Sequence, residues 1–271
     1  MASVTFSGTG ELTPTDVTAG LGSATTVIID GYTSIGNAAF VGKPQITSVT
    51  IGNSVTSIGE ASFWACSNLI SVTIGNSVIS IGDTAFKNCT SLTSITIGNS
   101  VISIGGVAFQ NCTSLTSVTI GNSVTSIGPT AFQSCTRLTS VTFGNSVISI
   151  GPTAFKYCTS LTSITIGNSV TSIGDNAFQN SGLTTVYIAN GQVISEITFQ
   201  SPSSGVSFFG KIVTTIDPFA IPPPTPPTPT FSRIPIRILF TNNAQVYYKP
   251  HSLASGGIGS VRNCRFKSKK T

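Results

Sequence analysis

The sequence repeats itself with a period of 23 residues, and this repeat limits the possible folds more than any other feature. A marker of the form Ile-Gly-x-x-x-Phe returns with its isoleucines 23 residues apart, as at Ile58 and Ile81. A fixed period of this length is typical of a solenoid, in which each unit buries its apolar side chains against its neighbours. The markers lie at Ile35/Phe40, Ile58/Phe63, Ile81/Phe86, Ile104/Phe109, Ile127/Phe132, Ile150/Phe155 and Ile173/Phe178.

One unit, residues 92–114, shows how each coil should fold. Ile95 and Ile97 alternate with polar residues, a pattern that predicts a strand with one buried face. A Gly-Asn pair then favours a turn, and Ile104 belongs to a second short strand. Val107-Ala108-Phe109 begins a run that is long enough for a single helical turn, and Phe109 is the largest side chain expected in the core. Each coil is therefore predicted to be strand, turn, short strand and helical turn.

The shared pattern of the units is L-x-x-[VI]-x-I-x-x-x-V-x-x-I-G-x-x-A-F-x-x-C. It resembles the leucine-rich repeats of the BspA-like class, also called the Treponema pallidum type, over residues 24–199. The resemblance implies a right-handed coil with parallel strands, used for adhesion and protein–protein contact in bacterial and protist surface proteins and in large DNA viruses. The family usually has Pro after the first strand, whereas this chain has Gly, as at Gly98 and Gly121. We expect that difference to alter a turn and to leave the fold unchanged.

The segments around the repeat have other expected roles. Residues 1–31 lack the Ala-Phe-x-x-Cys signature and are expected to cap the N-terminal edge of the stack. Residues 32–199 form the solenoid of 23-residue units, and residues 200–220 are expected to form a C-terminal cap. Residues 221–230 are rich in proline, which favours an extended linker. A ligand for a proline-binding module is the alternative for that segment.

Residues 231–271 are predicted to be a short β-rich segment that docks on a larger surface. Strand-like runs occur there, but so short a segment cannot bury a strong core of its own. Only 8% of the residues in the chain are charged. Residues 32–199 carry four basic and four acidic residues, so the net charge of +5 arises from residues 231–271. The candidate docking residues are its basic and tyrosine side chains: Arg233, Arg237, Tyr247, Tyr248, Arg262, Arg265, Lys267, Lys269 and Lys270.

Five of the six cysteines share one repeat position and should stack in a row. We expect buried, reduced thiols, because an inward-facing cysteine behaves as a small apolar residue. The strand spacing would also permit bridges between adjacent coils. A zinc site is not expected, since no histidine accompanies these thiols, and Cys264 is the thiol expected to react. The stacked thiols, called the thiol row below, are Cys66, Cys89, Cys112, Cys135 and Cys158.

No catalytic group of residues emerges from the sequence. The single histidine, His251, lies near the C-terminus, and the carboxylates are scattered without a paired motif. We therefore expect no enzymatic activity, no cofactor, no metal and no small-molecule substrate. Trp64, in a repeat position that varies, is either a binding anchor or an exposed packing variant.

The sequence favours a non-catalytic scaffold for protein partners. In this interpretation the solenoid is displayed while residues 231–271 dock it on a large assembly, such as the virion of a large DNA virus or phage. A cell-surface adhesin is the alternative, and nucleic-acid binding through the basic segment is less favoured. We expect no secretory signal peptide and no membrane span, because the chain has neither an apolar leader nor a sufficiently long apolar run. A virion or a cell surface is the expected location.

Overall fold

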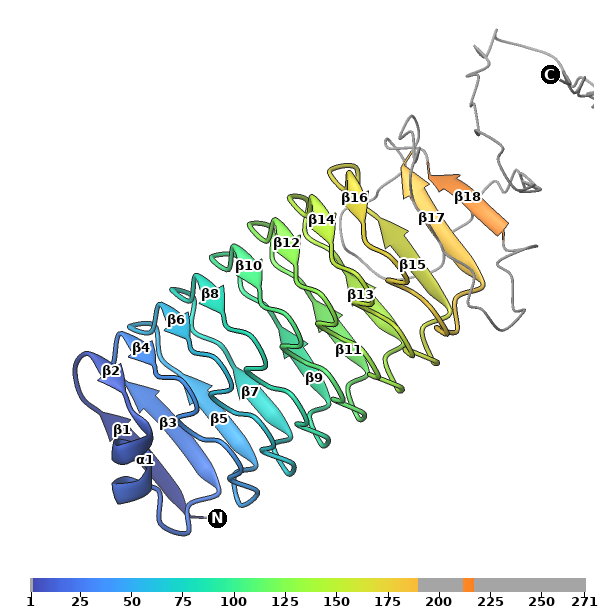
Figure 1. Ribbon diagram of the computed structural model, residues 1–271. Helices are drawn as coiled ribbons and strands as arrows, with labels where there is room; N and C mark the ends of the chain where they lie inside the picture. Colours follow the sequence, from blue (N-terminus) through green and yellow to red (C-terminus); the bar gives the residue numbers. More distant parts are fainter. Residues whose placement is uncertain (1, 190–211, 217–271) are drawn as a thin grey trace, which may run out of the picture.

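The computed structural model describes residues 2–189 and 212–216, which form an elongated stack of parallel coils (Figure 1). A typical coil contributes one long strand, one short strand and a chain of turns. The β-solenoid expected from the repeat is thus confirmed. The long strands are β1 (Ser3–Ser7), β3 (Thr26–Asp30), β5 (Ser48–Ile51), β7 (Ser71–Thr73), β9 (Ser94–Thr96), β11 (Ser117–Thr119), β13 (Ser140–Thr142), β15 (Ser163–Ile166), β17 (Thr185–Ala189) and β18 (Ile212–Ile216).

The short strands line a second side of the stack and form one continuous eight-stranded sheet. The long strands, in contrast, divide into three sheets, with the orders β1-β3-β5-β7, β9-β11-β13 and β15-β17-β18. Every pair is parallel and joins equivalent residues of neighbouring coils, so that Ser117 pairs with both Ser94 and Ser140. The short strands are β2 (Glu11–Leu12), β4 (Ser34–Ile35), β6 (Ser57–Ile58), β8 (Ser80–Ile81), β10 (Ser103–Ile104), β12 (Ser126–Ile127), β14 (Ser149–Ile150) and β16 (Ser172–Ile173).

The third side of each coil is a chain of turns, and the single helical turn predicted there is wrong. Thr84 and Asn88 have φ angles of 54° and 61°, in the left-handed region that a right-handed helix excludes. The N–H of Phe86 donates to the carbonyl of Ala108 in the next coil at 2.7 Å. The N–H of Lys87, one residue on, donates back to Thr84 within its own coil at 3.0 Å. Every second N–H group of the turns thus donates to a carbonyl of the next coil. This gives hydrogen-bond partners to backbone groups that would have none at the end of a single helical turn.

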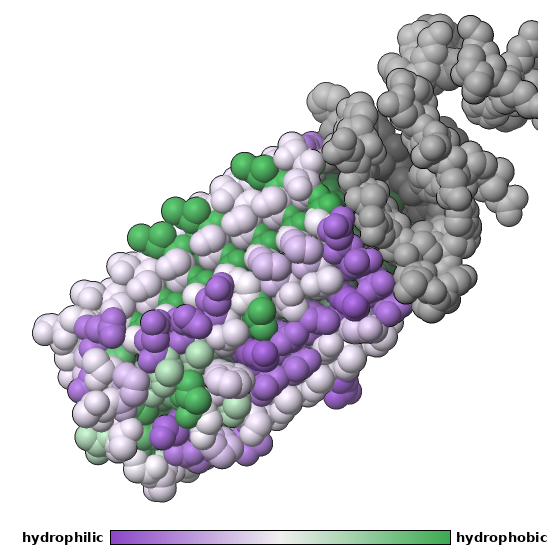
Figure 2. Space-filling model, viewed as in Figure 1, coloured by the Kyte–Doolittle hydropathy of each residue, from purple (hydrophilic) through white to green (hydrophobic). Residues whose placement is uncertain are grey.

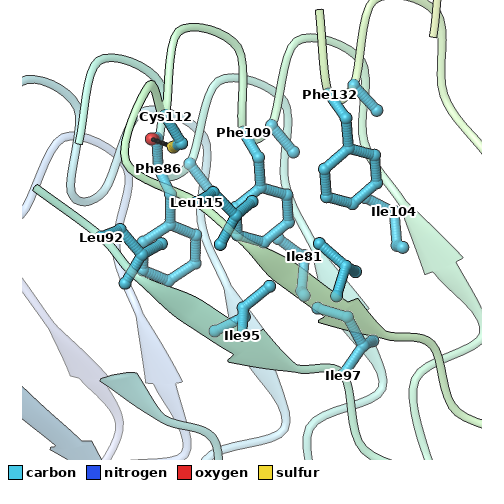
Figure 3. Close-up of a cluster of buried hydrophobic side chains, with 14 of the residues drawn as sticks. Ile81, Phe86, Leu92, Ile95, Ile97, Ile104, Phe109, Cys112, Leu115 and Phe132 are labelled. Carbon is cyan, nitrogen blue, oxygen red and sulfur yellow. Dashed lines mark hydrogen bonds between the residues drawn. The ribbon is translucent and has the colours of Figure 1, made fainter. Parts of the chain in front are cut away.

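The core is a column of phenylalanine rings running along the stack (Figure 3). Their centroids are 4.9–5.4 Å apart and their planes lie within 7° of each other. Leu92, Ile95, Ile97 and Ile104 pack beside this column and are buried, as the repeat pattern predicted. The members of this phenylalanine column are Phe40, Phe63, Phe86, Phe109, Phe132, Phe155 and Phe178.

The first coil carries a helix, α1 (Pro14–Gly20), where later coils have the chain of turns. Thr13 caps it: the Asp16 N–H donates to the Thr13 hydroxyl at 3.3 Å, and the Thr13 N–H donates to the Asp16 carboxylate at 2.9 Å. This reciprocal pair is a capping box, with Pro14 at the start of the helix. Val17 and Leu21 are buried at this end of the core.

The opposite end of the described stack is formed by β17 and β18, which pair in parallel from Thr185↔Ile212 to Ala189↔Ile216. The proline-rich segment 221–230 and the docking segment 231–271 lie outside the described residues. So does most of the segment expected to form the C-terminal cap. The division of the chain around the solenoid therefore stays a prediction.

Candidate interaction surface

The outward side of the long strands presents two rows of hydroxyl groups and no charge between β5 and β15. In each strand an inward Val or Ile separates an outward Ser from an outward Thr, as in Ser94-Ile95-Thr96, where only Ile95 is buried. The parallel register aligns these residues from coil to coil, and the Ser71 hydroxyl donates to the Ser48 hydroxyl at 3.2 Å. The Ser/Thr face, as we call it, consists of Ser48, Thr50, Ser71, Thr73, Ser94, Thr96, Ser117, Thr119, Ser140, Thr142, Ser163 and Thr165.

Threonines at the corner positions use their hydroxyls to bind the backbone of the preceding coil. The Thr116 hydroxyl donates to the Thr93 carbonyl at 3.0 Å, and the Thr56 hydroxyl donates to the Thr33 carbonyl at 3.0 Å. These hydroxyls hold coils together and are therefore less available to a partner.

Three coils have isoleucine in place of threonine at one of these corners. Ile79, Ile102 and Ile148 are 46%, 50% and 48% exposed and form a strip along the stack. Thr125 occupies the equivalent position of the coil between the last two and interrupts this strip. Figure 2 shows apolar residues along one edge of the stack, with polar residues gathered elsewhere on the same view. Isolated exposed isoleucines are common on soluble proteins, and a strip this narrow does not by itself define a partner.

The turn side carries amides and two aromatic residues. The Gln110 amide donates to the Gln133 side chain at 2.7 Å, one coil away. The Lys156 ammonium lies 4.9 Å from the centre of the Tyr157 ring. Trp64 is exposed, with 41% of its surface accessible to solvent. Its role as a binding anchor remains a prediction.

The thiol row is buried and unpaired, as expected. Each sulfur donates to the carbonyl of the phenylalanine 26 residues earlier, as in the 3.2 Å bond from Cys112 Sγ to the Phe86 oxygen (Figure 3). Burial raises the pKa of Cys66 to about 11 and that of Cys158 to about 12, and it raises the pKa of the three thiols between them well above the usual value. The nucleophilic thiolate is therefore suppressed, and the row acts as part of the core.

The part of the chain that the structure describes holds no group of three or more His, Cys, Asp or Glu side chains able to bind a metal ion. Within residues 2–189 and 212–216, no helix has the length and apolar character needed to cross a bilayer. The candidate docking residues, from Arg233 to Lys270, all lie outside the described residues, and so do His251 and Cys264.

Comparison with known proteins assigns the family. A model of the BspA type leucine rich repeat region matches residues 33–136 and 79–206, with six copies, and so spans more than half of the chain. The chain belongs to the BspA-type leucine-rich repeat family. The stacked coils, the phenylalanine column and the thiol row are therefore the form that BspA-type repeats take in this chain. No curated protein matches the chain.

Solved structures of bacterial leucine-rich-repeat proteins are similar to it. A leucine rich cell surface protein from Faecalibacterium prausnitzii A2-165 is 34% identical over 62% of this chain, with a TM-score of 0.56. The match covers 48% of that protein, so this chain spans about half of its length. The T. pallidum leucine rich repeat protein is 27% identical over 64% of this chain and 78% of its own, with a TM-score of 0.51.

Proposed function

We propose that this BspA-type protein is a non-catalytic interaction scaffold. In this proposal the solenoid is displayed, and residues 231–271 dock it on a large assembly, such as the particle of a large DNA virus or phage. The partners are other proteins, and neither a small-molecule substrate nor a cofactor takes part.

The observation that carries the proposal is that the thiols and phenylalanine rings lie inside the coils, whereas uncharged hydroxyl groups lie on the outer face of the long strands. The thiol row and the phenylalanine column are buried, so they serve the stacking of the coils. The exposed Ser/Thr face repeats from coil to coil and carries no titratable group that could act as a general acid or base. A surface of this kind offers many equivalent hydrogen-bonding groups and suits recognition of another protein.

The sequence supports a separate role for residues 231–271. Basic residues and tyrosines are concentrated there, whereas the coils carry few charges. Arginine and tyrosine are enriched at protein interfaces, where they supply both buried area and hydrogen bonds.

The test is to purify particles or cell envelopes from the source and to detect the full chain in them by quantitative mass spectrometry. A chain that ends at Pro229 is compared with the full chain in the same preparation, and circular dichroism checks that its coils remain folded. We expect the full chain in the assembly and the shortened chain in the soluble fraction. Equal recovery of both chains with the assembly would contradict the docking role.

A cell-surface adhesin is the second candidate, because the similar F. prausnitzii protein is described as a cell surface protein. Labelling of intact cells with a reagent that does not cross membranes separates the two. Labelling of the chain on intact cells supports an adhesin, whereas its recovery in purified particles supports the assembly component. Nucleic-acid binding would instead appear as a salt-dependent shift of DNA or RNA on a native gel.

A further inference from the structure

The N-terminal end of the stack combines an open strand edge with negative charge. β1 is the first strand of its row and pairs on one side only, with β3. The other edge of β1 therefore has no strand partner among the described residues, and an edge of this kind can accept an added strand.

Only the backbone edge of this end is open, because its apolar side chains are covered. Phe6 packs edge-on against Phe40, with ring centroids 5.8 Å apart, and Phe6 is buried. Leu12 and Val17 are fully buried in the same coil. A partner at this end is therefore expected to use strand pairing and charge, since little apolar surface remains to be covered.

Three carboxylates lie in the first two coils, at this end of the stack. Asp30 ends β3 opposite Ser7, the last residue of β1, and Glu11 begins β2 a few residues later. Both are exposed, and neither side chain has a hydrogen bond or ion pair with another described residue. Asp16 adds a third carboxylate in the first turn of α1. No Lys or Arg precedes Lys43 in the sequence, so this end of the stack is acidic.

The C-terminal segment has the complementary properties. Ile234, Ile236 and Ile238 alternate with other residues, a pattern typical of a strand with one apolar face. Pro235 lies within this run, and proline is tolerated where its missing N–H faces away from the sheet, as in an added edge strand. Arginines and lysines accompany the run, and acidic residues are absent from 231–271.

We propose that the β1 edge, with Glu11, Asp16 and Asp30, is the docking surface for residues 231–271 of a second copy of this chain. The inference rests on the proposed docking role of that segment and identifies its partner. Copies then associate head to tail, and the added strand continues the parallel row from one copy toward the next. An association of this kind is head to tail, so it builds a ring of copies where the rotation between copies closes and an open chain where it does not.

The direction of the stack favours a second copy over the same copy. Among the described residues, β18 is the last strand of the row, at the end opposite β1, and the long strands are parallel. Within one copy, the segment would have to return along the eight steps from β1 to β17, about 38 Å at ~4.8 Å a strand. In copies stacked end to end, the β1 edge of the next copy faces the β18 end of the described row, and the added strand lies between them.

Sedimentation velocity over a range of concentrations tests the proposal with the full chain. Glu11→Gln/Asp30→Asn removes two exposed carboxylates from the docking surface. Glu60→Gln/Asp175→Asn, the matched control, removes two exposed carboxylates from later coils. We expect concentration-dependent association of the native chain and of the control. We expect association of the docking-surface variant to be weaker by roughly tenfold, as for the loss of two exposed ion pairs, and association of the native chain to weaken with salt.

Cross-linking distinguishes a second copy from the same copy. Equal amounts of 14N- and 15N-labelled full chain are mixed and treated with a carbodiimide, which joins carboxylates to amines without a spacer. Linked peptides between Glu11 or Asp30 and the lysines at 267–270 should contain both isotopes in one product. Links formed only within one isotope would overturn the proposal, as would a native chain that stays monomeric or a docking-surface variant that associates like the native chain.

The outcome for the shortened chain separates this inference from the proposed function. If ending the chain at Pro229 abolishes association but Glu11→Gln/Asp30→Asn does not, residues 231–271 dock elsewhere. The inference then fails while the docking role stands. If the shortened chain associates as the full chain does, both fail.

Discussion

Removal of one ring from the phenylalanine column should destabilise the whole stack. Phe109 is fully buried, and its ring lies 5.2 Å from the Phe86 ring and 5.1 Å from the Phe132 ring. The planes are within 5° of parallel on both sides. Truncation of a buried Phe generally costs about 3–5 kcal/mol, and each aromatic pair contributes about 0.5–1.5 kcal/mol of that stability. Because Phe109→Ala removes two such pairs, we expect a loss toward the upper end of the range.

Thr96→Ala in the same coil is the control. Thr96 lies on the exposed Ser/Thr face, so we expect a change within about 0.5 kcal/mol, as for most surface substitutions. Guanidinium unfolding followed by circular dichroism gives the free energy for both variants and the native chain. Equal losses for Phe109→Ala and Thr96→Ala would refute the assignment of inside and outside. A small loss for Phe109→Ala alone would show that the column does not carry the stability of the stack.

Three further outcomes are expected. Gly121→Ala should lower the melting temperature far more than Gly98→Ala. A Cβ at position 121 would lie 2.6 Å from the backbone carbonyl carbon of Gly98, whereas a Cβ at position 98 would meet nothing within 4 Å. Similar melting temperatures for the two variants would contradict this spacing of the coils. Ser62→Ala should raise the free energy of unfolding by about 1–3 kcal/mol, because the buried Ser62 hydroxyl has no hydrogen-bond partner. The equivalent residue of the other coils is Ala. An unchanged free energy of chemical unfolding would argue against an unpaired hydroxyl. The thiol row should resist iodoacetamide in the native chain while Cys264 reacts; disulfide-linked peptides from adjacent coils would instead show an oxidised row.

The repeat pattern predicts the inside of this protein well. Positions such as Leu92, Ile95 and Phe109 return at a fixed spacing, and only a stack of equivalent coils buries all copies of such a position together. The burial of the thiol row follows from the same argument. Exposed positions are less constrained, because the sequence does not say which of them a partner contacts.

The backbone of the turns could not be predicted in the same way. Val107 adopts a φ of 62°, although a β-branched residue disfavours this region. Its N–H donates to the Pro129 carbonyl of the next coil at 2.8 Å. The conformation is thus set by a neighbouring coil and not by local preference. Helix α1, in contrast, had a local signal, because Thr13, Pro14 and Asp16 are the residues of a capping box with proline at the first helical position.

The pairing of the long strands is interrupted twice along the stack, whereas that of the short strands is not. The short strands form one unbroken sheet, whereas the long row divides after β7 and after β13. Val72 and Ile74, at the first division, are only partly buried, and so are Val141 and Phe143 at the second. Phe143 replaces the Ile of other coils, and its ring packs edge-on against Phe155 at 6.0 Å. Residues 71–74 at the first division have the same sequence as residues 48–51 in the undivided part of the row, so the side chains of this segment do not explain the first division.

This arrangement places the Ser/Thr face on the side of the coils where the strand pairing is interrupted. The phenylalanine column and the short strands continue past both divisions, so a shift between neighbouring long strands leaves the core in place. The same reasoning predicts that hydrogen exchange in β9 and β15, next to the divisions, is faster than in β11, which pairs on both sides. Uniform protection of the three strands would show that the long row is as firmly joined as the short one.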